Sequence, residues 1–155
     1  MKSALKICLA VVLLLLQSAY AQEVAVLLPV TGPLTPFERS TLTQEVAAEM
    51  SAGFDLKYGA EVDRFVKQVF QDESKKKDCD EANCYRRIAA KYHAEKIAAL
   101  RVVQAEKGDY LVAAHLYDVA SGEMTASEKM ECAQCSFEKL KTVCKALSRR
   151  IAGIK

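Results

Sequence analysis

The stretch "KIAALRVVQAEKGDYLVAAHLYDVASGEMTASEKMEC", residues 96–132, holds three strand-like runs separated by two short polar turns. The turns, "AEKGD" at 105–109 and "ASGE" at 120–123, each contain a glycine, which accepts the backbone angles of tight turns. Runs joined by such short turns pair with their sequence neighbours. The stretch therefore predicts an antiparallel meander of three strands, and it makes a β-sheet the centre of the fold.

Two earlier segments predict further strands. The run "VAVLLPV" at 24–30 is aliphatic without alternation, which is typical of a strand buried on both faces. The segment "FDLKY" at 54–58 alternates apolar and polar residues and predicts a short strand. The sheet should therefore have about five strands.

The first helix has a well-marked start. Thr35 as N-cap, Pro36 at the first helical position and Glu38 form a capping box. Thr41 and Gln44 repeat the spacing, so a start about one turn later stays open. The expected buried stripe of this helix is Leu42, Val46 and Met50.

Three more segments have helical periodicity. One begins near Ala60 and ends in a polar loop at 71–78, the next is capped by Asp80, and the last is capped by Ser136. Their inward residues are expected to be Val62, Phe65, Val66, Val69 and Phe70; Cys84, Ile88 and Tyr92; and Phe137, Leu140, Cys144, Leu147 and Ile151. The fold class is α/β (α+β-like), a single layered domain with helices packed on a mixed sheet.

Residues 1–21 are typical of a secretory signal peptide. Lys2 and Lys6 precede the apolar run 7–16, and Ala19 and Ala21 form the small-x-small pattern at which signal peptidase cuts. The apolar run is short of the roughly 20 residues that span a bilayer. We expect cleavage after Ala21, a periplasmic or secreted protein, and no integral membrane segment in the mature chain.

The predicted mature chain, residues 22–155, fits one domain because removal of 21 of the 155 residues leaves 134. Without Lys2 and Lys6 it has 20 basic and 20 acidic residues. Nucleic-acid binding is not expected, because a domain that binds duplexes normally carries a basic excess. Gln22 rather than cysteine follows the cut, so lipid attachment there is not expected either.

The mature chain has five cysteines, and export favours disulfides. We expect local pairs, Cys79 with Cys84 and Cys132 with Cys135, although four cysteines allow three pairings. Cys144 lies on an apolar helix stripe and is predicted to be a free, buried thiol.

The cysteines allow three other uses. A thiol-disulfide oxidoreductase using Cys132 and Cys135 is the main alternative, because a helix start just after the pair would lower a thiol pKa. Its position near the end of the chain differs from thioredoxin-like proteins. A zinc site of Cys79, Cys84, Cys132 and Cys135 lacks the spacing of compact zinc modules. Haem attachment would need histidine where Ser136 stands.

The remaining polar candidates are expected to have structural or solvated roles rather than catalytic ones. His93 lies at a helix end, and His115 lies in a strand on the face opposite Val112, Ala114 and Leu116. Asp118 precedes a turn, whose backbone it is expected to bond. No catalytic, cofactor-binding or metal-ligating residue is predicted, and no cofactor.

Taken in order, the segments "VAVLLPV", "CDEANCYRRIAAKYHAEKIAALRVVQAEKGDYLVAAHLYDVASGE" and "CAQCSFEKLKTVCKAL" resemble the TolB N-terminal domain and the related CsgG-like family of exported bacterial domains. The resemblance implies a non-enzymatic module that binds protein partners in the cell envelope; family members act in trafficking, secretion channels and activation of cell-wall synthases. It supplies no catalytic residue, and the partner and oligomeric state stay open.

Overall fold

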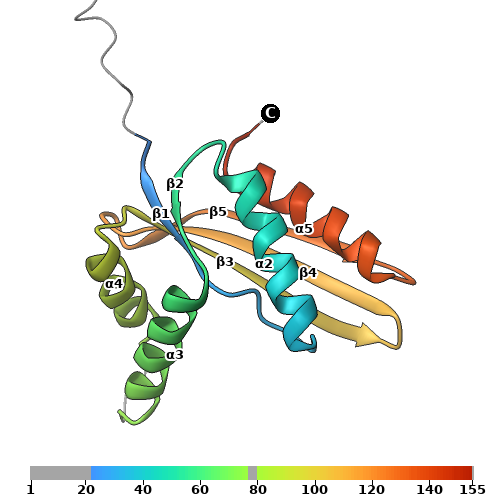
Figure 1. Cartoon of the computed structure of the whole chain (residues 1–155), viewed down its shortest axis with the longest axis horizontal. Coiled ribbons are helices and arrows are strands. Elements are labelled where there is room, and N and C mark those ends of the chain that lie inside the picture. Colours follow the sequence, from blue (N-terminus) through green and yellow to red (C-terminus); the bar gives the residue numbers. More distant parts are fainter. Residues whose placement is uncertain (1–21, 77–79, 155) are drawn as a thin grey trace, which may run out of the picture.

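The computed structural model describes residues 22–76 and 80–154. Over these residues the chain forms one five-stranded mixed sheet with four helices packed on it, which confirms the predicted α/β class (Figure 1). The strands are β1 (Val24–Leu27), β2 (Asp55–Lys57), β3 (Lys96–Glu106), β4 (Asp109–Asp118) and β5 (Glu123–Cys132). The helices are α2 (Pro36–Met50), α3 (Ala60–Ser74), α4 (Glu81–Tyr92) and α5 (Phe137–Ile151). The predicted signal peptide lies outside the described residues.

The strand order is β2-β1-β3-β4-β5. β1 pairs in parallel with β2 and β3, whereas β3, β4 and β5 form the predicted antiparallel meander. Register irregularities fall at Gln104/Glu106 and at Leu116/Tyr117. The sheet thus has a short parallel half and a long antiparallel half.

β1 is buried on both faces, as its aliphatic run predicts. Ala25 and Leu27 belong to one core cluster, and Val26 and Leu28 belong to the other. The strand ends earlier than position 30 because Pro29 has no N–H to donate. The loop that follows still bonds to β3: the Thr31 N–H donates to the Leu100 carbonyl (3.1 Å).

The capping box of α2 is formed as predicted. The Glu38 N–H donates to the Thr35 hydroxyl (3.2 Å), and the Thr35 N–H donates to the Glu38 carboxylate (2.8 Å). The helix therefore starts at the earlier of the two candidate caps. Farther along the helix, the Thr43 hydroxyl accepts a hydrogen bond from the buried Val30 N–H (3.2 Å). This bond connects the loop after β1 to α2.

The sequence predicts that a polar loop begins at residue 71. This boundary was wrong, because α3 continues to Ser74. Glu73 is 1% exposed. Its carboxylate pairs with Lys76 (2.6 Å) and lies 3.8 Å from Arg87 on α4. These partners offset the cost of burying a carboxylate. The last turn of α3 thus buries a single carboxylate within a polar, otherwise accessible segment, because that carboxylate has basic partners, one of them on α4.

The helices cover the two faces of the sheet unequally. α2 and α5 lie side by side along one face and enclose the larger core cluster. α3 and α4 pack on the other face, at one end, against β1 and the start of β3. Figure 1 shows the β3–β4 hairpin extending beyond α3 and α4. Part of the second face therefore has no helix from residues 22–76 or 80–154 over it.

Candidate binding groove

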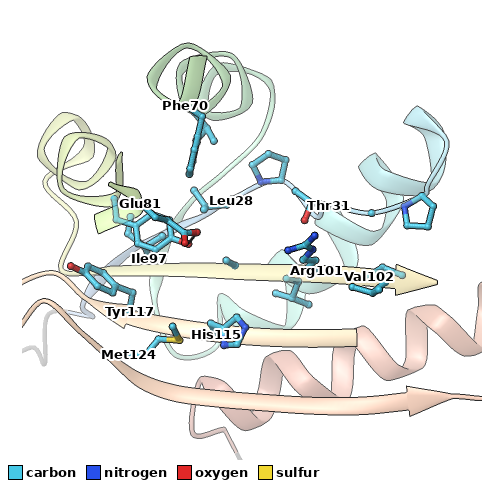
Figure 2. Close-up of a pocket in the computed structure, with 18 of the residues that line it drawn as sticks. Leu28, Thr31, Phe70, Glu81, Ile97, Arg101, Val102, His115, Tyr117 and Met124 are labelled. Atoms are coloured by element: carbon cyan, nitrogen blue, oxygen red, sulfur yellow. Dashed lines mark hydrogen bonds between the residues drawn. The ribbon is translucent and has the colours of Figure 1, made fainter. Parts of the chain in front are cut away.

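The half-covered face carries a groove of about 850 Å³. Its walls are α3 and α4 on one side and the loop 28–33 on the other, and its floor is β3 with the ends of β4 and β5 (Figure 2). This volume lies in the range of ligand sites in proteins, roughly 300–1,000 Å³. We call this site the groove.

One end of the groove is apolar and aromatic. The Tyr85 ring lies 5.2 Å from the Tyr117 ring and 6.4 Å from the Phe70 ring, between centroids. The Tyr85 hydroxyl donates to the Glu81 carboxylate (2.6 Å). Burial, with this bond, raises the pKa of Tyr85, so its hydroxyl stays protonated. Ile97 of β3 completes the floor.

The other end carries a positive charge. Arg101 is exposed, and its side chain rises from β3 toward Thr31 of the loop (Figure 2). Within residues 22–76 and 80–154, no hydrogen bond or ion pair of its guanidinium is found. His115 lies between the two ends, with its Nδ1 3.0 Å from the Ser127 hydroxyl.

The strand register sets this arrangement. On the open face, Ile97 pairs with Tyr117, Ala99 with His115, and Arg101 with Ala113, which in turn pairs with Lys129 of β5. Side chains two residues apart on a strand lie on the same face. The aromatic end, then His115, then the row with Arg101 and Lys129 therefore follow one another along the same face of the sheet.

Sequence reasoning missed this groove. It treated His115 as structural or solvated and did not single out Arg101. The available signal was the alternation in β3, where Ala98, Leu100 and Val102 are buried and Arg101 and Val103 are exposed. That pattern indicates a two-sided strand, but it does not say what lies above the exposed side.

The predicted cysteine pair at the end of β5 is joined in the structure. Cys132 and Cys135 form a disulfide with a Cα–Cα distance of 5.3 Å, which fits the expected local pairing. The Cys135 N–H donates to the Gly108 carbonyl (2.6 Å), and the Gln134 N–H donates to the Asp109 carboxylate (2.7 Å). The disulfide turn is therefore bonded to the β3–β4 turn.

Replacement of Cys135 with alanine should lower the free energy of unfolding by about 2 kcal/mol, the chain-entropy estimate for so short a loop. Urea denaturation of the oxidised protein measures this loss. Reduced wild type should be destabilised by a similar amount and serves as the matched control. A variant as stable as the oxidised wild type would show that the Cys132–Cys135 disulfide does not stabilise the fold.

Cys84 lies apart from this pair, whereas Cys144 shares a core cluster with Cys132. Cys84 is buried with the cluster under α3 and α4, whereas Cys132 and Cys144 are buried with the cluster on the other face. The sheet therefore separates Cys84 from Cys132, which argues against the four-cysteine zinc site. Cys79 lies outside the described residues, so its pairing with Cys84 stays a prediction. Burial raises the pKa of the Cys144 thiol to about 12.

The other polar candidates have structural contacts. His93 ends α4 in a left-handed conformation (φ 51°). Asp118 accepts the Ser121 N–H (2.7 Å) as the turn predicts, and its carboxylate also accepts from the Lys96 ammonium (2.6 Å). The bond with Lys96 is the main reason that the pKa of Asp118 is lowered.

This pair predicts a pH dependence of stability. The folded pKa of Asp118 lies below its ordinary value of 3.8, so its contribution is present above about pH 4 and is lost as the pH falls further. Asp118→Asn should therefore lower the melting temperature at pH 7, and the difference from wild type should shrink in acid. Lys96→Gln should remove the same contribution, and the double variant should lose little more. A difference that stays constant down to pH 2 would contradict this.

Among the described residues, no group of histidine, cysteine, aspartate and glutamate is arranged to hold a metal ion. No helix in residues 22–76 and 80–154 has the length and apolar content needed to cross a membrane.

The fold and groove define an open-faced α/β domain, and solved structures of bacterial proteins share this fold. No protein-family model matches the sequence, and no curated protein matches it. The chain is similar to the LpoB C-terminal domain from Salmonella enterica, with a TM-score of 0.50 and 16% identity, covering 76% of this chain and 87% of that one.

Two further similarities cover more of the chain. Lipoprotein GNA1162 from Neisseria meningitidis has a TM-score of 0.50 and 16% identity, over 83% of this chain and 96% of that one. PelC from Paraburkholderia phytofirmans, solved as a dodecamer, has a TM-score of 0.52 and 12% identity, over 87% and 91%. At these identities the likeness concerns the fold alone, and the narrower assignment to TolB or CsgG stays a prediction.

Proposed function

We propose that this protein is a non-enzymatic accessory module of the bacterial cell envelope, periplasmic or secreted, which binds a protein partner through the groove. The observation that carries the proposal is the groove itself. It has an aromatic end and an exposed Arg101, and within residues 22–76 and 80–154 Arg101 has no bonding partner and the adjoining sheet face has no helix over it. A concave site of this size, with apolar and aromatic walls and a few polar groups, is the usual form of a binding site.

The cysteines favour this function over thiol-disulfide exchange. An attacking thiol must reach its substrate as a thiolate. Cys132 is 1% exposed, and the pair precedes Ser136, the N-cap of α5, so neither cysteine lies in the first turn of the helix. The Cys144 thiol is fully buried. Fold neighbours from bacteria, one of them a lipoprotein, and the predicted signal peptide support an envelope location.

Site-specific photo-crosslinking tests the proposal. A photoreactive residue at Met124 or Val103, both exposed on the rim of the groove, should give a discrete protein adduct in the native envelope fraction. The matched control is Arg150, which is exposed on α5, the helix on the opposite face. Equal adducts from Arg150, or none from the rim, would overturn the groove as the binding site.

An insulin-reduction assay tests the alternative enzyme. The proposal predicts no turnover above a protein-free control. Turnover that is lost in Cys132→Ser would instead establish thiol-disulfide exchange and would contradict the non-enzymatic role.

A further inference from the structure

We infer that the occupant of the groove is an extended acidic segment of the partner protein, with an apolar side chain at the aromatic end and a carboxylate at Arg101. This inference rests on the proposed function and adds the chemistry of the partner. It follows from the charge of the groove, from the spacing of its two ends and from the mixed character of its lining.

The positive charge of Arg101 at one end of the groove favours binding of an anion. A guanidinium offers a planar fork of N–H donors that matches a carboxylate. The Arg101 guanidinium is exposed and has no bonding partner among residues 22–76 and 80–154. Its side chain points toward Thr31, whose backbone forms an isolated parallel bridge with that of Arg101 (Figure 2). Lys129, in the same cross-strand row, adds a second positive charge nearby.

The opposite end favours an apolar group and disfavours a second acid. Phe70, Tyr85 and Tyr117 form its aromatic wall. The Glu81 carboxylate, held by the Tyr85 hydroxyl, gives this end a negative charge. A carboxylate placed there would be repelled, so the two ends fix the direction in which an acidic segment binds.

The strand spacing sets the length of the segment. Ile97 and Arg101 lie on the same face of β3, four residues apart. At about 3.3 Å per residue, the two ends are about 13 Å apart. An extended segment lying along β3 covers this span with five residues, i to i+4, and residues i and i+4 face the same side. We therefore expect an apolar residue and an aspartate or glutamate at that spacing.

A peptide fits the lining better than a lipid chain does. Thr31, Gln104 and His115 interrupt the apolar lining with polar groups. A peptide backbone can bond with such groups, whereas an acyl chain would leave them without partners at a cost in free energy. The uncovered sheet face beyond the groove also gives a longer segment room to continue.

Peptide selection tests the inference. Random heptapeptides displayed on phage would be selected against the purified protein, against Arg101→Glu and against the matched control Arg150→Glu. Wild type and the control should enrich peptides with an acidic residue four positions from an apolar one, and Arg101→Glu should lose this enrichment. Melting curves would check that each variant is folded.

Affinities of the enriched peptide give the magnitude. By fluorescence anisotropy, Arg101→Glu should weaken binding at least tenfold. Replacing the acidic residue of the peptide with its amide should weaken binding to wild type by a similar factor, with little further effect on Arg101→Glu. Failure to enrich any peptide, enrichment without acidic residues, or an affinity unchanged by Arg101→Glu would overturn the inference.

Two outcomes separate this inference from the proposed function. If the groove rim gives crosslinked protein adducts but the phage selection enriches no acidic peptides, the acidic segment is refuted and protein binding at the groove stands. Loss of both would refute both. A dansylated fatty acid that binds wild type but not Arg101→Glu, with no peptide enriched, would reassign the groove to an anionic amphiphile.

Discussion

Replacing Leu147 with alanine should lower the free energy of unfolding by about 2–5 kcal/mol, the range for large-to-small changes in a packed core. Leu147 is fully buried on α5, in the cluster that joins α5 and α2 to the sheet. The change removes apolar contacts and leaves a cavity that rigid helices cannot fill. Denaturant unfolding gives the magnitude.

The matched control keeps the side-chain volume. Leu147→Met should cost less than about 1.5 kcal/mol, because such swaps are tolerated best. Equal losses from the two variants would show that volume at this position does not matter and would contradict the packing described for α5.

The second large effect is expected at Gly32, on the rim of the groove. Its φ of 143° is one that residues with a side chain avoid. An added Cβ would also overlap the backbone carbonyl of Val102 and approach the Val102 Cβ to 2.9 Å. Gly32→Ala should therefore destabilise the protein by about 3 kcal/mol or more, since backbone strain alone costs about 1–3 kcal/mol.

Gly108 provides the comparison for Gly32. Its φ is also positive, at 87°, but an added Cβ would have nothing within 4 Å. Gly108→Ala should show only the cost of backbone strain. The difference between the two variants in the free energy of unfolding, measured by urea denaturation, then gives the cost of the clash between the Gly32 position and Val102 of β3. Equal losses would mean that no such clash occurs.

The elements with local signals could be predicted from the sequence. The capping box at Thr35 predicted the start of α2 as the first of two candidates, and the glycine-containing turns predicted the meander. These signals work because a cap or a tight turn involves residues only a few positions apart. The end of α3 was misjudged because the partners that allow Glu73 to be buried include Arg87, on a different helix.

The groove could not be predicted in this way. Its walls come from the loop after β1, from α3 and α4, and from strands more than fifty residues later than that loop. Helical periodicity indicates that α3 has an apolar side, but not which part of the sheet that side covers. Arg101 becomes a candidate only once the sheet face above it is known to be open.

The position of β1 bears on how the chain assembles. It is the earliest described strand, yet it lies between β2 and β3, and its first residue bonds to Glu95, 71 positions later. The hairpins of β3, β4 and β5 close over a few residues each. Closing the centre of the sheet therefore costs more chain entropy than forming its antiparallel half. During synthesis from the N-terminus, β1 would stay without its β3 partner until Lys96, 69 positions after Leu27, had been added.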